Sequence, residues 1–394
     1  MKHILSIFVI VTCFASKGVL ANTASVNKAF QAPKLILITI DGLRTQEVFN
    51  GIDERLYQHE KYVSKKAQLA NTYWHEDSKK RQQKLLPFIA TTIVNDGVLL
   101  GSSLEGERIT VANNMNFSYP GYHEIFTGKL DASITSNAKI VAKYPSFLEV
   151  LADKYPKEFK PAAFASWDVF PYILRRGLHD VYINAGFEPY EVADANTAIP
   201  LVERNRLSLL NRLQVDTPSP WATVRLDAFT HAYAMHHLKS HKPRVMSISY
   251  GDTDDFAHDG KYDEYILAST RTDRFIKEVW DYLQSDTFYA NKTNLIITTD
   301  HGRGVSPDDW QHHASVVAVK GYMKALGHFE HGIVGSENVW IAAIGPNIRK
   351  PLSSEFSAST IQITPTIYSL LDKCELAAKQ DHKAIDIIKE NPCE

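Results

Sequence analysis

The feature that most constrains the fold is an alternation of short apolar runs with longer amphipathic stretches. The apolar runs are rich in β-branched or small residues and are predicted to be buried strands: residues 35–40, 162–165, 245–250, 295–299 and 339–344. Amphipathic stretches of helical character lie between them: residues 145–155, 226–239 and 264–283. Strands separated by helices predict an α/β fold with a mainly parallel central sheet and helices on both faces.

Two segments depart from this alternation. Residues 44–87 are polar, charged and aromatic, and we predict that they form a helical insertion near the active site. Residues 92–100 contain Asn95-Asp96-Gly97, a signal for a hairpin turn. No interdomain linker interrupts the chain, so residues 30–372 are predicted to form one domain, followed by a tail at 373–394.

The first residues are typical of an export signal. A basic start at Lys2 and His3 precedes an apolar run over residues 4–14 and then small residues, with cleavage after Ala21 or Ala24. This run is too short to cross a bilayer, and no other stretch is apolar enough to do so. We therefore predict a signal peptide at 1–21 and an exported protein, periplasmic or secreted. A buried N-terminal strand and a lipid anchor at Cys13 are the alternatives.

Cysteine and charge limit the chemistry further. If Cys13 leaves with the signal, Cys374 and Cys393 remain, an even number that predicts a disulfide pinning the tail, with two free thiols as the alternative. The formal net charge of -2 gives no broad field to attract nucleic acid or an anionic membrane. Since the chain has 16 histidines and 3 cysteines, a metal site would be built from histidine and carboxylate.

Metal-capable side chains follow several of the predicted strands, where an open α/β sheet binds its ligands. Each has a plainer explanation when taken alone: a turn, the start of a solvated helix or a loop histidine. The residues are Asp41, Asp254, His258, Asp300, His301 and, after a later polar stretch, His331, with His312, His313 and His328 nearby. Mixed aspartate and histidine ligands suit zinc, whereas calcium prefers oxygen ligands alone. The coincidence predicts a metal centre.

Ser118 is the candidate nucleophile. Pro120 follows it within what is predicted to be the first turn of a helix running to about Thr127. Backbone N–H groups at such a helix start face an incoming phosphate oxygen. A serine hydroxyl is a weak nucleophile at neutral pH, but coordination to a metal ion lowers its pKa. Without metal ligands around it, the same motif is a simple helix cap.

These residues, in this order, resemble the alkaline phosphatase superfamily, and within it the nucleotide pyrophosphatase/phosphodiesterase-like branch. The resemblance runs from the ITIDG strand end to ITPTIYSLLD near the C-terminus. It implies two zinc ions per chain. One would be held by Asp41, Asp300, His301 and Ser118, and the other by Asp254, His258 and His331. It also implies two chemical steps: Ser118 attacks phosphorus to give a phosphoserine, which a water on the second zinc hydrolyses.

The chain departs from this branch at two positions. Many relatives have a threonine nucleophile followed three positions later by an asparagine that holds a phosphate oxygen, whereas this chain has Ser118 and Gly121. Arg303 is a candidate for that substrate-binding role, with a plain surface arginine as the alternative. The last metal ligand is also open, since His312 and His313 lie nearer to Asp300 than His331 does.

The expected activity is hydrolysis of a small-molecule phosphate ester. Monoester, diester and pyrophosphate substrates are not distinguished by the sequence, nor is the oligomeric state. A sulfatase is disfavoured because Tyr122 stands where its maturation motif has arginine, while a phosphonate hydrolase stays open. A non-catalytic exported binding protein is the alternative of another class. It is disfavoured because every expected ligand position, and the nucleophile, carries a competent side chain.

Overall fold

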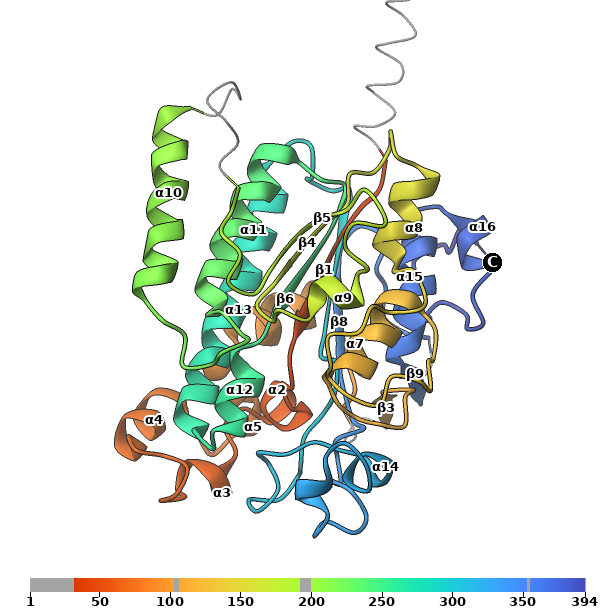
Figure 1. The fold of residues 1–394 in the computed structure, drawn as a ribbon. Helices are drawn as coiled ribbons and strands as arrows, with labels where there is room; N and C mark the ends of the chain where they lie inside the picture. Colours follow the sequence, from red (N-terminus) through yellow and green to blue (C-terminus); the bar gives the residue numbers. More distant parts are fainter. Residues whose placement is uncertain (1–31, 103–105, 192–199, 353–354, 394) are drawn as a thin grey trace, which may run out of the picture. The chain divides into compact units, whose positions relative to one another are not determined.

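A seven-stranded sheet organises the part of the chain that the computed structural model describes, residues 32–102, 106–191, 200–352 and 355–393 (Figure 1). The predicted signal peptide, residues 1–21, lies outside the described residues. In sheet order the strands are β2 (Val98–Leu100), β8 (Ile341–Ile344), β7 (Thr293–Thr298), β1 (Lys34–Ile40), β6 (Val245–Tyr250), β4 (Ala162–Ala165) and β5 (Tyr182–Ala185). The strands from β7 to β5 run parallel, whereas β8 pairs antiparallel with both β7 and β2.

The central strand β1 shows why helices are needed on both faces of the sheet. All seven of its residues are buried, and alternate side chains point to opposite faces. Ile36, Ile38 and Ile40 join one hydrophobic core, and Leu35 and Leu37 join the other. Such a strand is stable only when both faces are covered, so the predicted α/β fold is confirmed.

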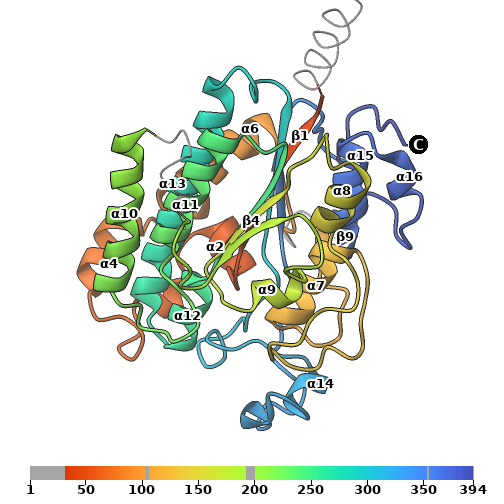
Figure 2. The ribbon, with the colours of Figure 1, turned by 45° about the horizontal axis from the view of Figure 1, so that its top comes forward.

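Two sets of helices supply that cover (Figures 1 and 2). The core containing Ile38 is completed by α11 (Asp227–His241) and α13 (Tyr262–Ser285), with α10 (Leu201–Asp216) packed outside α11. The core containing Leu37 is completed by α7 (Ser118–Thr127), α8 (Phe147–Lys154), α9 (Phe170–Ile173), α15 (Ile363–Leu370) and α16 (Cys374–Ala377). The described helices include none that is both long and apolar enough to cross a membrane.

The predicted insertion at residues 44–87 is helical. It contains α2 (Thr45–Asn50), α3 (Glu54–Tyr57), α4 (Lys66–Tyr73) and α5 (Ser78–Leu85). Aspartate side chains start two of these helices: Asp53 accepts the N–H of Arg55, and Asp77 accepts those of Lys79 and Lys80. Buried Leu56, Leu69 and Leu85 then fix the insertion to the core beside β1.

The predicted hairpin turn at Asn95-Asp96-Gly97 is wrong. The residues before β2 are helical, as a π-helix (Ile89–Ile93) followed by α6 (Val94–Asp96), and β2 pairs with β8 instead. Asp273 stabilises the start of this helix by accepting the N–H groups of Phe88 and Ile89 at 2.8 and 2.9 Å. Gly97 follows the last residue of α6. Glycine is needed there because a Cβ would lie 2.2 Å from the carbonyl oxygen of Ala343 on β8.

The C-terminal part closes the fold. A separate two-stranded sheet pairs β3 (Glu107–Thr110) with β9 (Phe356–Ser359). A short 3-10 helix (Thr360–Gln362) leads into α15, and Cys374 forms a disulfide with Cys393 across a Cα–Cα distance of 4.9 Å. The predicted disulfide is confirmed, and it ties the tail beyond α16 back to the domain.

Removing this disulfide is expected to lower stability without touching the chemistry. The double variant Cys374→Ser/Cys393→Ser should lose about 3 kcal/mol of unfolding free energy, because the bridge restricts the unfolded chain over a separation of 19 residues. Urea unfolding measures the loss, and a reducing agent should reproduce it in the parent. Equal stability of the oxidised parent and the double variant would contradict this expectation.

Candidate active site

Three neighbouring strands carry the predicted metal ligands to one edge of the sheet. Asp41 directly follows β1, and Asp300 and His301 follow β7. Asp254 and His258 lie on α12 (Asp252–His258), the short helix that follows β6. Because β7, β1 and β6 are adjacent and parallel, these ends converge, and all these side chains except that of His258 are buried.

Asp41, Asp300 and His301 form the first ligand group, with candidate ligand atoms all within 4.8 Å of one another. The His301 Nε2 atom lies 3.3 Å from Asp41 Oδ1 and 3.4 Å from Asp300 Oδ2. Neither of these carboxylate oxygens has a hydrogen-bond partner among the described residues, although both are buried. Such atoms are costly to bury unpaired, so this donor set fits a divalent cation.

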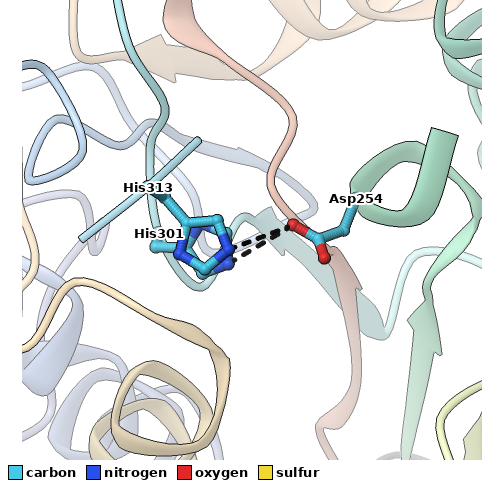
Figure 3. Close-up of side chains that lie close together, drawn as sticks. All are labelled: Asp254, His301 and His313. Carbon is cyan, nitrogen blue, oxygen red and sulfur yellow. Dashed lines mark ion pairs between the residues drawn. The ribbon is translucent and has the colours of Figure 1, made fainter. Parts of the chain in front are cut away.

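Asp254, His301 and His313 form a second group by the same criterion (Figure 3). Asp254 Oδ2 lies 3.1 Å from His258 Nε2, which in turn lies 3.0 Å from His313 Nε2. The imidazole rings of His301 and His313 are stacked with their centroids 3.7 Å apart. The two ligand groups share His301, so they form one candidate centre that includes His313.

Backbone carbonyls orient both buried imidazoles. His301 Nδ1 lies 2.9 Å from the carbonyl oxygen of Gly302, and His313 Nδ1 lies 3.0 Å from that of Asn116. When Nδ1 carries the proton and donates a hydrogen bond to the carbonyl, Nε2 has a free lone pair that can bind a metal ion. This is the arrangement that commonly orients histidine ligands of metal ions.

The structure does not bring His331 to this cluster. Its side chain is exposed and makes no hydrogen bond, ion pair or ring contact with the described residues. The chain leaves the site after His313, forms α14 (Val316–Val319) and a 3-10 helix (Lys324–Leu326), and returns where Ile333 N–H donates to the Ala314 carbonyl. Ala314, Ala318 and Ile333 pack in a small core of their own, so the segment containing His331 folds outside the site.

Ser118 lies at the first residue of α7, as predicted. Its Oγ is 3.3 Å from His301 Nε2, and its side chain is only 5% exposed. The Tyr119 N–H donates to Asn137 Oδ1, so the Ser118 N–H is the one at this helix start for which the described residues offer no acceptor. The positive end of α7 thus faces the point where Ser118 meets the ligand group.

Gly121 sets how closely α7 approaches the metal ligands. A Cβ at this position would lie 2.2 Å from the backbone oxygen of Asp300. A side chain here would collide with the Asp300 backbone unless α7 moved. The close packing of α7 on Asp300 fixes Ser118 relative to the ligand group.

Gly121→Ala is expected to displace α7 from Asp300. We expect a loss of about 1–3 kcal/mol in unfolding free energy from overpacking. A shift of Ser118 should also lower kcat, on the order of 10²-fold for a misplacement near 1 Å. Gly321→Ala is the matched control, because the nearest atom to its Cβ would be 3.5 Å away. Parent-like kcat in Gly121→Ala would contradict the positioning role of this packing.

Arg303 is a buried residue and not a surface arginine. Its guanidinium forms an ion pair with the Asp254 carboxylate, and Nη2 also donates to the Asp254 carbonyl at 3.0 Å. Nε donates to the Gly42 carbonyl at 3.1 Å, and Nη1 donates to the Gln311 carbonyl. The guanidinium is therefore engaged in holding Asp254, which leaves it less available to grip phosphate than the sequence led us to expect.

Gly42 and Tyr122 are site residues that the motifs did not reveal. Gly42 has a φ of +58°, and a Cβ there would lie 2.7 Å from both Arg303 Nε and Asp254 Oδ1. Tyr122 donates from its hydroxyl to Asp41 Oδ2 at 3.0 Å. Burial raises the pKa of Tyr122 well above its usual value, so the hydroxyl keeps the proton that orients Asp41. The Asp-Gly dipeptide after β1 was the available signal for Gly42.

Electrostatics favour a cation at this centre. Burial and then the neighbouring Asp41 raise the pKa of Asp300 well above its usual range, and burial followed by Asp254 raises that of Asp41. For His301, burial alone would lower the pKa, but the surrounding carboxylates, Asp300 foremost, raise it to about 9. A metal ion competes with protons for ligand atoms whose pKa values are raised, so metal binding should release protons and weaken as the pH falls.

Burial alone would raise the pKa of Asp254, but Arg303, His258 and His313 hold it well below its usual range. Asp254 therefore carries a negative charge whether or not the other carboxyls are protonated. The Arg303 guanidinium balances the charge of this ligand.

Comparison with known proteins agrees with this site. The family model "Metalloenzyme superfamily" matches residues 223–353, the part that carries Asp254, Asp300, His301 and His313. Among solved structures, the alkaline phosphatase PafA has a TM-score of 0.54 at 10% identity, over 86% of this chain and 96% of that one. The lipoteichoic acid synthase LtaP from Listeria monocytogenes has a TM-score of 0.49 at 9% identity, over 93% and 82%.

Murine ectonucleotide pyrophosphatase/phosphodiesterase 5 has a TM-score of 0.44 at 11% identity, over 86% of this chain and 95% of that one. No curated protein sequence matches the chain. The family match covers α12 and the segment after β7, which hold most of the ligand groups described above, and the likeness to PafA extends the shared fold over most of the chain. Residues 223–353 thus match the metalloenzyme superfamily, and the chain shares its fold with the alkaline phosphatase PafA.

Proposed function

We propose that this protein is a metal-dependent hydrolase of small-molecule phosphate esters that acts through a phosphoserine at Ser118. The observation that carries the proposal is the position of Ser118 Oγ, 3.3 Å from His301 Nε2. It lies beside a ligand group in which Asp41 Oδ1 and Asp300 Oδ2 are buried with no hydrogen-bond partner among the described residues. A nucleophile beside an electrophilic ion is the arrangement that activates a serine hydroxyl.

The donor set favours two zinc ions. Three aspartates and three histidines provide the candidate ligands, a mixture that suits zinc better than magnesium or calcium. Asp41, Asp300, His301 and Ser118 would hold one ion, and Asp254, His258 and His313 would hold the other. Bound zinc would lower the pKa of the Ser118 hydroxyl and offset the negative charge of the ester.

The residues of the chain then perform two displacements. Ser118 Oγ, having lost its proton to solvent, attacks phosphorus, and the ester oxygen leaves with the electron pair of its bond to phosphorus and takes up a proton from solvent. The Ser118 N–H and the positive end of α7 face the phosphoryl oxygens. A water molecule next attacks phosphorus and gives up a proton, the bond from phosphorus to Ser118 Oγ breaks, and Oγ takes up a proton to regenerate the serine. Phosphate is released from a monoester, and a phosphate monoester is released from a diester.

We also propose that the protein is exported, to the periplasm or outside the cell. The disulfide between Cys374 and Cys393 supports this, because such bonds persist in oxidising compartments. The signal-like character of residues 4–14 supports it from the sequence.

The direct test is an assay of the zinc-loaded protein against p-nitrophenyl phosphate, bis-p-nitrophenyl phosphate and p-nitrophenyl sulfate. We expect turnover of at least one phosphate ester, its loss after metal removal by a chelator, and its return with zinc. Faster turnover of the sulfate would make the protein a sulfatase. Bound zinc with no turnover of any ester would favour the binding-protein alternative.

A further inference from the structure

A basic cavity of about 560 Å³ adjoins the candidate metal centre. It is formed by the start of α2, by Arg55 on α3, by Arg108 on β3 and by residues 303–305 after β7. Arg303 belongs to both places, since it lines this cavity and forms the ion pair with Asp254. The other residues that line this cavity have no role in the proposed reaction.

The charge of the lining is strongly one-sided. Four arginines line the cavity and one carboxylate does: Arg44, Arg55, Arg108 and Arg303 against Glu107. The Glu107 carboxylate already accepts the N–H groups of Gly101 and Ser102, at 2.9 and 3.2 Å. The guanidinium groups give the lining its basic character, although Glu47, Asp53 and Asp254, which are not part of the lining, pair with three of the four arginines.

Three of these arginines have structural partners, and that of Arg303 is Asp254, as described above. Arg44 pairs with buried Glu47 and donates to the Gly304 carbonyl at 3.0 Å. Arg55 pairs with Asp53 and donates from Nη2 to the Val305 carbonyl at 2.9 Å. These contacts tie the helical insertion to the segment after β7. They leave Nη1 of Arg55 without an acceptor among the described residues.

Arg108 has no such structural partner among the described residues. Its side chain is exposed and makes no hydrogen bond or ion pair with any described residue. Its neighbours across the cavity are also polar: Thr45, Gln46 and Asn50 on α2 bring a hydroxyl and two amides to the lining. Guanidinium groups and amide N–H donors together match the oxygens of a phosphate or carboxylate.

We propose that this cavity binds an anionic group of the phosphate or carboxylate class, with Arg55 and Arg108 as its principal charged contacts. The arginines disfavour a cation, and the larger apolar side chains of the lining are limited to Phe49, Ile109 and Val305. The site is separate from the reaction at Ser118 and does not depend on it.

The test uses inorganic phosphate as the probe and the full chain carrying Asp300→Asn. This substitution removes a candidate metal ligand, and so it should weaken phosphate binding by a metal ion at the catalytic centre. Calorimetric titration should detect phosphate binding in this background. Arg108→Ala and Arg55→Ala, each added to it, should weaken that binding about tenfold or more, the loss expected for one charge-assisted contact. Arg212→Ala on α10, an exposed arginine outside the cavity, is the matched control and should bind phosphate as the background does.

Arg108→Ala removes no hydrogen bond or ion pair between described residues, so its melting temperature should equal that of the parent. A loss of phosphate binding in this variant would therefore not be caused by unfolding. Absence of phosphate binding in the Asp300→Asn background would overturn the proposal. So would binding that is unchanged in Arg108→Ala, or weakened equally by Arg212→Ala.

Discussion

Ser118→Ala should abolish phosphate-ester turnover while leaving the metal centre and the fold in place. We expect kcat/KM to fall on the order of 10³-fold or more, because the variant loses the atom that forms the covalent intermediate. The remaining ligands, Asp41, Asp300 and His301, are untouched, so zinc content should stay close to that of the parent. Steady-state kinetics and metal analysis on the same preparation measure both quantities.

Ser285→Ala is a suitable control for this substitution, because it removes an exposed hydroxyl at the end of α13 that donates only to the Tyr282 carbonyl. It should behave as the parent does. Turnover in Ser118→Ala that matches the parent would show that another group attacks phosphorus, and the proposed mechanism would then be wrong even if the protein remained a phosphatase.

His313→Ala should remove one of the two metal ions. His313 Nε2 lies among the second ligand group, 3.0 Å from His258 Nε2 and 3.7 Å from Asp254 Oδ1. Loss of a ligand should cost more than the 10–100-fold that removal of an outer-shell partner typically costs, so we expect activity to fall by at least about 10²-fold. Zinc stoichiometry and kcat/KM measured across a zinc titration give the two readouts.

His331→Ala is the matched control for this prediction, since the sequence left His331 and His313 as competing ligands. The exposed His331 should be replaceable with no change in zinc content or activity. The reverse pattern, loss of zinc in His331→Ala and retention in His313→Ala, would mean that the segment at residues 314–335 closes onto the site when metal binds.

Most ligands could be predicted because each lies just beyond a recognisable strand. Asp41 and Asp300 follow apolar runs that are buried on both faces of the sheet, and the order of such strands places their ends together. Asp254 and His258 are four residues apart on α12, which is why they meet. The local sequence pattern was therefore sufficient to predict these four residues as candidate ligands.

The last ligand could not be predicted in this way, because it depends on where a long connection folds. His313 and His331 are both followed by small residues, and only the packing of Ala314 against Ile333 shows that the chain leaves the site at the first of them. The same holds for the Arg303 contact with Asp254, a partner 49 residues away, and for Gly121, whose role is set by the Asp300 backbone. Asn95-Asp96-Gly97 misled because helix ends use the same residues as hairpin turns.

The central claim is that Ser118 becomes phosphorylated during turnover. The most direct measurement is to mix the zinc-loaded protein with excess p-nitrophenyl phosphate, quench with acid within one turnover, and map the phosphorylated peptide by mass spectrometry. We predict one phosphoryl group on Ser118, absent from Ser118→Ala and from the metal-depleted parent. Rapid turnover with no phosphoryl group on Ser118 at any quench time, or with the group on another residue, would contradict it.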